Sequence, residues 1–249
     1  EVLAYDSVVR SLKKNTLPYI ARGNAYLASG RPKEALENYD CALKLKRKLP
    51  DVLVLKGEAL TMLGRCKEAI RQFDMAVKAQ PENAEAFGGR AIARLGAGLL
   101  GKANADWRRQ FALLKGRPSA RACVALRLAD YASALPELEL ALEKEPNDPY
   151  WHLYRLTARR RLGLSADIGN LPSNDAWPGL LLGLHVGHTT PDEVLKRADT
   201  DNRRAEAAFQ LGVLAVDGSN AASRRYWTDA IGQSSPSLIE HAAARNELA

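Results

Sequence analysis

The sequence predicts an all-α fold, a superhelical solenoid of antiparallel helix pairs. Small residues followed by an aromatic residue recur every 34 positions: Ala35 with Tyr39, Ala69 with Phe73, and Ala103 with Trp107. The same spacing relates a second set of small residues, Gly23, Gly57 and Ala91. Self-similarity at such a period indicates repeats in which each helix pair covers the apolar face of the next, with small residues where helices cross closely.

This period and this pattern of small and aromatic residues resemble those of tetratricopeptide repeats (TPRs). The resemblance implies a TPR superhelical solenoid whose first helices line a concave groove. A solenoid distributes burial along its length, so 249 residues with 46% hydrophobic content need no single central core.

The repeat pattern divides the chain into five segments. They are residues 1–15, the second helix of a truncated repeat; 16–116, three TPR repeats; 117–163, an irregular fourth repeat and the following helix; 164–200, a loop and short helices; and 201–249, a C-terminal TPR-like pair and a capping helix. The first segment is assigned because Tyr5–Arg10 align with Tyr39–Lys44 at the 34-residue offset. We therefore expect a fragment or processed product of a longer protein.

The first three repeats differ in regularity. The first runs from Thr16 to Leu49 and the second from Pro50 to Asn83. The third, from Ala84 to about Gly116, has Gln110 where the others have alanine and carries six glycines between residues 88 and 116. Glycine is a poor helix former, so looser helices are expected there.

The second half follows helix start and stop signals. Asn147-Asp148-Pro149 is typical of a helix N-terminus, as is Thr190 with Pro191. The predicted helices are 119–129, 131–144, 150–162, 178–185, 192–198, 203–216, 220–231 and 237–248, with a loop from 164 to 175. The last helix is expected to close the stack.

A more specific resemblance covers residues 130–249. The order Pro146-Asn147-Asp148-Pro149-Tyr150, Ala176-Trp177-Pro178 and Thr190-Pro191-Asp192-Glu193-Val194-Leu195 resembles the NlpI-like family of bacterial TPR lipoproteins, and Ala207–Gly212 and Ile239–His241 extend it. This resemblance implies a non-catalytic, often dimeric, envelope-associated scaffold that gathers cell-wall enzymes or a protease. It implies a periplasmic or envelope location, with the cytoplasm as the alternative, although the sequence shows no lipobox cysteine or signal sequence.

Charge and cysteine content restrict the partners only broadly. The net charge of +7 indicates attraction to partners that are acidic overall. Three cysteines cannot all pair within one chain, which argues against a disulfide framework. No apolar run is long enough to cross a bilayer.

Several patterns that could carry chemistry have simpler explanations. Gly96–Ala103 resembles a phosphate-binding loop, but Ala103 lacks the required hydroxyl and the segment joins two helices. His185 and His188 have no Cys or acidic cluster at ligand spacing, so capping or packing is favoured over metal binding. The basic runs end helices, where they complement the helix dipole. We predict no catalytic residues, no cofactor and no metal, and disfavour nucleic acid.

The concave groove is the candidate site. By repeat register its lining is Ile20, Asn24, Leu27, Val54, Glu58, Thr61, Gly88, Ile92 and Leu95. Only Asn24 matches the carboxylate-clamp pattern of TPRs that grip chaperone C-termini. A peptide with apolar anchors suits this lining, with Asn24 bonding its backbone and Glu58 its basic residue. The alternative is that these residues merely pack between helices.

The sequence therefore predicts a non-catalytic interaction scaffold or adaptor that binds a protein or peptide. The alternatives are a recognition or regulatory arm of an enzyme whose catalytic domain lies outside the chain, and a nucleic-acid-binding repeat. An uncapped end near Tyr5 also allows a homodimer.

Overall fold

The computed structural model describes residues 5, 8, 9, 11, 12, 14–165, 176–215, 221–233 and 238–249. All regular secondary structure within these residues is helical, which confirms the all-α prediction. The chain forms two compact units, which divide between Leu113 and Leu114. No helix in the described ranges is long and apolar enough to cross a membrane.

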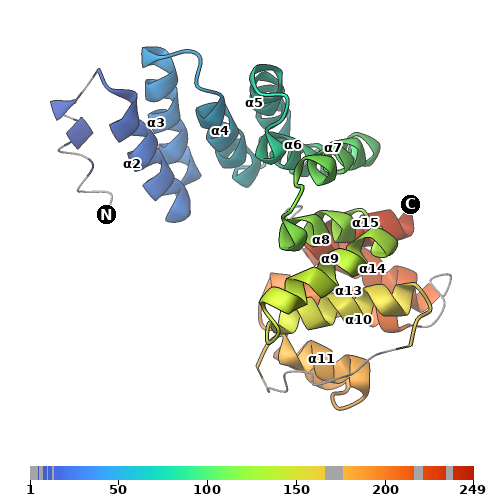
Figure 1. Cartoon of the computed structure of the whole chain (residues 1–249). Helices are drawn as coiled ribbons and strands as arrows, with labels where there is room; N and C mark the ends of the chain where they lie inside the picture. Colours follow the sequence, from blue (N-terminus) through green and yellow to red (C-terminus); the bar gives the residue numbers. More distant parts are fainter. Residues whose placement is uncertain are drawn as a thin grey trace. The chain divides into compact units, whose positions relative to one another are not determined.

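Unit 1 is a stack of three helix pairs, blue to green in Figure 1. Its helices are α2 (Thr16–Ala28), α3 (Pro32–Leu45), α4 (Pro50–Met62), α5 (Cys66–Ala79), α6 (Ala84–Gly96) and α7 (Leu100–Leu113). Each first helix packs on its own second helix, and the second helices α3 and α5 pack on the first helix of the next pair. The predicted helix at residues 1–15 falls largely outside the described residues.

Local sequence explains where these helices begin and end. Proline occupies the first turn of α3 and α4, where a missing N–H costs no hydrogen bond. The side chains of Asn15 and Asn83 accept backbone N–H bonds at the starts of α2 and α6. Gly64, with φ of 71°, ends α4 in the left-handed conformation that glycine adopts without strain.

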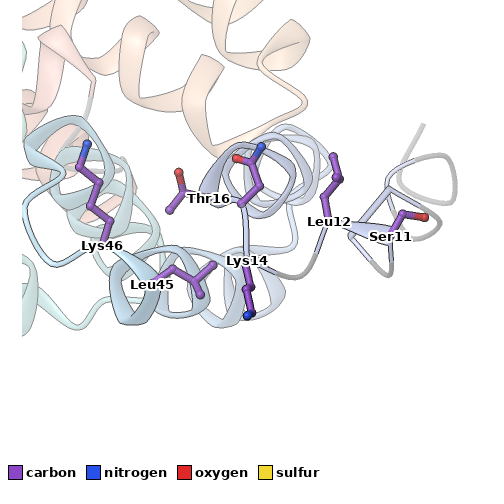
Figure 2. Close-up of a pocket in the computed structure, with 7 residues that line it drawn as sticks. Ser11, Leu12, Lys14, Thr16, Leu45 and Lys46 are labelled. Atoms are coloured by element: carbon purple, nitrogen blue, oxygen red, sulfur yellow. The ribbon is translucent and has the colours of Figure 1, made fainter.

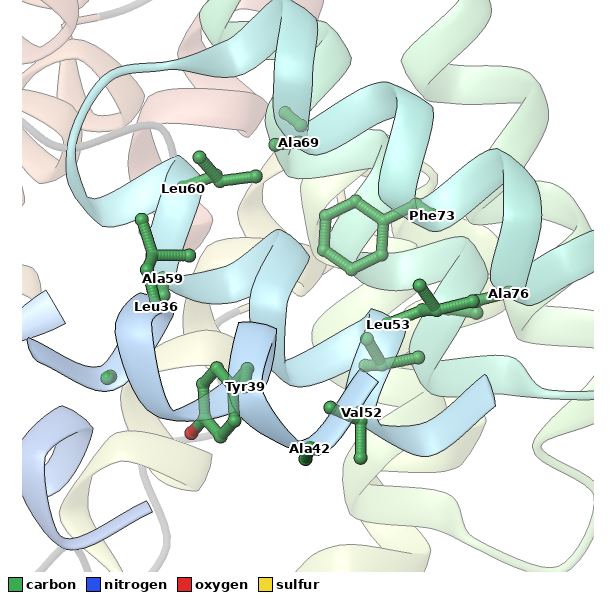
Figure 3. Packing of buried hydrophobic residues seen from close by; sticks show 14 residues of the cluster. Leu36, Tyr39, Ala42, Val52, Leu53, Ala59, Leu60, Ala69, Phe73 and Ala76 are labelled. Carbon is green, nitrogen blue, oxygen red and sulfur yellow. The ribbon is translucent and has the colours of Figure 1, made fainter. Parts of the chain in front are cut away.

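Small residues let aromatic rings fill the core of unit 1. Ala69 and Phe73 are fully buried, and so are their equivalents Ala35 and Tyr39 (Figure 3). A Cβ atom built on Gly57 would lie 2.7 Å from the Phe73 ring. The glycine is therefore required for this ring to seat against the backbone of α4.

The third repeat compensates for its large residue at position 110. A Cβ atom on Gly88 would lie 2.3 Å from Nε2 of Gln110. The bulk added by Gln110 is therefore offset by the absence of a side chain at residue 88, where the other repeats carry Ile20 and Val54. Both α6 and α7 are continuous helices, so the expected looseness is not seen as a break.

Unit 2 contains two further helix pairs, a single full-length helix, two short helices and a C-terminal helix. These helices are α8 (Pro118–Arg127), α9 (Tyr131–Lys144), α10 (Pro149–Arg161), α11 (Gly179–Val186), α12 (Pro191–Arg197), α13 (Asp201–Leu214), α14 (Ala221–Gln233) and α15 (Ile239–Leu248). Helices α8 and α9 form one pair, and α13 and α14 the other. The predicted loop at 164–175 falls mostly outside the described residues.

Helix α15 does more than close the end of the stack. It packs on α14, as a final helix would, but also on α8, the first helix of unit 2 (Figure 1). Asn246 bonds the carbonyl oxygen of Arg127 at the end of α8. Unit 2 is thereby closed on itself, which the sequence does not predict.

Candidate functional site

The predicted groove residues differ in how far their side chains reach solvent. Asn24 and Glu58, which share one register position on α2 and α4, are exposed. Ile20, Leu27, Thr61 and Ile92 are partly buried, whereas Val54, Gly88 and Leu95 are buried between helices. The exposed surface is therefore smaller than the predicted set, since Val54 and Leu95 pack within the stack.

The hydroxyl group of Tyr39 connects the second helix of the first repeat to this surface. It donates a hydrogen bond to Oδ1 of Asn24 at 2.9 Å. Desolvation, followed by the nearby charge of Glu58, raises the pKa of Tyr39 to about 12, so the hydroxyl stays protonated. Tyr39 therefore fixes the Asn24 side chain and leaves its amide group available to a partner's backbone.

Glu58 lies among groups that disfavour its charge. Desolvation raises the pKa of its carboxyl, and the carboxylate of Glu85 on α6 raises it further. Glu85 and Asp51 occupy the same register position in the first turns of α6 and α4. A positive group near these two carboxylates would offset their repulsion and would lower this pKa again.

Two large apolar side chains flank these polar groups. Leu17, in the first turn of α2, is 68% exposed, and Met62, in the last turn of α4, is 57% exposed. The predicted groove lining includes neither residue. The 34-residue register could have found Leu17, because it is equivalent to Asp51 and Glu85.

The surface formed by the first helices of unit 1, here called the first-helix face, contains no Lys or Arg at its five register positions in each repeat. These positions hold Leu17, Ile20, Asn24, Leu27 and Ala28; Asp51, Val54, Glu58, Thr61 and Met62; and Glu85, Gly88, Ile92, Leu95 and Gly96. The face is therefore apolar with a few acidic groups, although the chain as a whole is basic.

The repeat unit itself identifies the family. The model of the tetratricopeptide repeat matches residues 20–84 and again 55–109, which together span α2 to α7. Residues 20–109 of unit 1 are tetratricopeptide repeats.

Solved structures agree with this fold over nearly the whole chain. A tetratricopeptide repeat protein from Parabacteroides merdae has 13% identity and a TM-score of 0.53, with 100% of this chain and 91% of that one covered. The C-terminal part of a TPR repeat-containing protein from Cytophaga hutchinsonii has 14% identity and a TM-score of 0.50, with 94% and 89% covered. YrrB, described as a TPR protein with an unusual peptide-binding site, has 17% identity and a TM-score of 0.49, with 75% and 93% covered. No curated protein matches the sequence.

Cations of the TPR array are used between helices. Arg90 on α6 donates to both oxygens of Asp106 on α7, at 2.9 and 2.7 Å, and to Asp74 on α5 at 2.8 Å. Arg94 adds a 2.7 Å bond to the same buried Asp106. This network joins the second and third repeats, and the sequence analysis did not foresee it. Arg90 and Lys56 occupy equivalent positions 34 residues apart. The ammonium group of Lys56 likewise pairs with an aspartate of the preceding repeat, Asp40.

The other sequence patterns lie in structural positions. Gly96 ends α6 and Leu100 begins α7, so the segment resembling a phosphate-binding loop is a turn between two helices of one TPR. His185 is buried and its Nε2 lies 2.9 Å from Oε1 of Gln210. Burial lowers the pKa of His185 to about 4, which keeps the ring neutral. No group of metal-ligating side chains occurs in the described part of the chain.

A pocket that is open to solvent lies at the N-terminal end of the array. It has a volume of about 940 Å³, and its lining includes Leu12, Lys14 and Thr16 from the start of the chain with Leu45 and Lys46 from the end of α3 (Figure 2). It is away from the predicted groove residues and shares none of them. Its lining contains Lys14 and Lys46 and no acidic side chain.

Proposed function

We propose that this protein is a non-catalytic interaction scaffold or adaptor that binds a peptide segment of a partner on the first-helix face of unit 1. The observation that carries the proposal is the exposure of Leu17 and Met62 beside Asn24 and Glu58. Apolar anchors give affinity to such an interface, while a few polar groups fix the orientation of the peptide.

The charge of the face favours one chemical class of peptide. A lysine or arginine placed between apolar residues would meet Glu58 and Glu85, whose mutual repulsion it would relieve. The net charge of +7 favours a partner that is acidic elsewhere on its surface. The proposed ligand is therefore a locally basic, apolar segment of a protein that is acidic overall.

The finer proposal concerns the partner's class. The resemblance of residues 130–249 to NlpI-like lipoproteins supports a homodimeric adaptor of the bacterial envelope that gathers cell-wall enzymes or a protease. This version is separable from the peptide-binding proposal, because the first-helix face would bind the same segment in any compartment.

Selection from a random peptide library tests the binding site. Peptides selected on the immobilised chain should contain Lys or Arg beside apolar residues. The double variant Glu58→Lys, Asn24→Ala should bind these peptides with about ten-fold or more lower affinity, as measured by fluorescence anisotropy. Glu37→Lys on α3 is the matched charge control, because Glu37 is exposed on a second helix. Selected peptides that bind the double variant as well as the wild type would contradict the assignment.

An apolar pair of variants tests the anchors. Met62→Asp should weaken binding, whereas Met75→Asp on α5 should leave it unchanged, although Met75 is 52% exposed and chemically identical. Equal losses from both substitutions would indicate nonspecific apolar binding.

A further inference from the structure

Helix α15 is enclosed by the rest of unit 2. Residues 240–244 are buried without interruption, so neighbours surround this stretch on all sides. The helix has 10 residues and lies against α8, α13 and α14. It is therefore a short segment seated in a site that the other helices form.

The site of α15 includes the face that is open in unit 1. One register position holds Asn24, Glu58 and Ile92 at the 34-residue spacing and, because the turn after α8 comes three residues early, Cys123 on α8. Asn24 and Glu58 are exposed, whereas Cys123 is partly buried, and desolvation followed by the charge of Glu240 on α15 raises the pKa of its thiol. Helix α15 lies on α8 and bonds the carbonyl oxygen of Arg127 at 2.7 Å. In unit 2 the end of the chain thus covers the surface that unit 1 leaves to a partner.

Polar contacts hold α15 in this site. Glu240 accepts a 2.9 Å bond from the hydroxyl group of Tyr154 on α10. Glu247 accepts bonds from the Tyr131 hydroxyl at 2.7 Å and from Arg161 at 2.6 and 3.0 Å. Apolar contacts add to these bonds, because Ala243 and Ala244 are buried in one cluster with Trp227 and because Leu248 packs against this cluster.

We propose that α15 is a detachable occupant of unit 2, and that its release uncovers a second helix-binding surface on α8, α10, α13 and α14. The occupant is the segment seen in place, residues 239–248. The inference takes from the proposed function only the use of first helices as a binding surface. Its test does not depend on any peptide found for unit 1.

Glu240 makes this docking sensitive to pH. Desolvation raises the pKa of its carboxyl to about 7, and the carboxylate of Glu206 contributes in the same direction. The groups that face it are Tyr150 and Tyr154 on α10, Glu206 on α13, and Cys123 and Arg127 on α8. Of these, only Arg127 lowers the pKa of Glu240 by its charge.

The direction of the pH effect follows from linkage. The docked helix holds a proton on Glu240 that a released helix would lose at lower pH, near the ordinary carboxyl pKa of 4.5. Docking is therefore favoured in acid, weakens as the pH rises from about 4.5 to about 7, and changes little above that.

Hydrogen exchange of the α15 amides in the full chain provides the first test. At pH 8, after correction for intrinsic rates, these amides should exchange at least about ten-fold faster in the wild type than in Glu240→Gln, which keeps an acceptor for Tyr154 without a charge. At pH 5 the two proteins should differ much less. Glu143→Gln, an exposed carboxyl on α9, should behave as wild type. Equal exchange in wild type and Glu240→Gln at pH 8 would overturn the proposal.

A labelled peptide tests whether release uncovers a binding surface. The probe is a synthetic peptide of residues 238–249 that carries Gln at position 240. This substitution keeps the side chain at position 240 uncharged at every pH used. The peptide should bind the wild-type chain at pH 8. It should bind the Glu240→Gln chain at least about ten-fold more weakly, because α15 of that variant stays docked and occupies the surface.

Alkylation of Cys123, which is near Glu240, should be faster in the wild type than in Glu240→Gln at pH 8, with Cys41 and Cys66 of unit 1 as internal references. Absence of peptide binding to the wild type would refute the second surface even if α15 exchanges rapidly.

Discussion

The two units use the same repeat chemistry for different ends. In unit 1 the first helices keep an exposed row that includes Asn24 and Glu58. In unit 2 the equivalent position on α8 holds Cys123, which is partly buried, and helix α15 lies on α8. The difference arises from one helix, because α15 returns to the first helix of its own unit instead of extending the stack.

This difference separates two kinds of energetic organisation. An open stack gains stability from neighbouring pairs, so a local defect should stay local. A unit closed by its last helix connects distant parts of the sequence, such as Tyr131 with Glu247. Damage in unit 2 should therefore spread further along the chain than damage in unit 1.

Truncation of the buried aromatic residues should give the largest effects. Phe73→Ala and Trp227→Ala each remove a side chain with no exposed surface, at a cost of about 3–5 kcal/mol in the free energy of unfolding. Amide exchange after Phe73→Ala should rise in α4, α5 and α6 alone, whereas Trp227→Ala should also raise it in α8, through the loss of α15 packing. Denaturant unfolding with hydrogen exchange measures both.

An exposed substitution provides the reference for this comparison. Met75→Ala on α5 should change the free energy of unfolding by no more than about 0.5 kcal/mol. If Trp227→Ala affects only α13 and α14, unit 2 is an open stack and its closure by α15 contributes nothing to stability.

The sequence predicts unit 1 far better than unit 2, for a physical reason. Ala35, Tyr39 and Gly23 recur at a fixed offset because each repeat makes the same local contacts. The position of α15 depends on pairs such as Asn246 with Arg127, which are 119 residues apart and occur once. A periodic signal cannot reveal a contact that is not repeated.

The candidate site was predictable only in part for a related reason. Repeat register places Asn24 and Glu58 correctly among exposed positions, but it also selects Val54 and Leu95, which are buried. Register gives the direction of a side chain on its helix. It does not give the depth to which the neighbouring helix covers that side chain.

Removal of Arg161 should have the next largest effect. Its guanidinium makes two bonds to Glu247, whose side chain is 8% exposed, and lies 5.3 Å from the centre of the Trp227 ring. Arg161→Ala leaves that carboxylate without its cation and should cost about 2–3 kcal/mol, less than a fully buried pair because Arg161 keeps some contact with solvent. Urea unfolding measures the loss.

A matched ion pair in unit 1 sharpens this result. Arg65 bonds Glu68 with comparable geometry, at 2.7 and 2.8 Å, but both side chains are exposed. Arg65→Ala should therefore destabilise the protein much less than Arg161→Ala does. Similar losses at Arg65 and Arg161 would show that closing unit 2 adds no strength to its ion pairs.

The smallest effect concerns the turn that ends each first helix. Gly64 in unit 1 and Ala129 in unit 2 occupy equivalent turns, with φ of 71° and 53°. The backbone bonds match as well, since Gly64 bonds the carbonyl oxygen of Thr61 and Ala129 that of Leu126, each at 2.9 Å. Ala129 thus holds a conformation that costs a residue with a Cβ atom about 1–2 kcal/mol.

Exchanging the two residue types should therefore have opposite effects. Gly64→Ala should destabilise unit 1 by about 1 kcal/mol, because alanine would adopt the left-handed conformation at a site built for glycine. Ala129→Gly should stabilise unit 2 by about 0.5–1 kcal/mol, since the relieved strain exceeds the added entropy of the unfolded chain. Thermal unfolding of the two variants measures both signs. A loss of stability in Ala129→Gly would mean that the methyl group of Ala129 contributes more by packing than its backbone conformation costs.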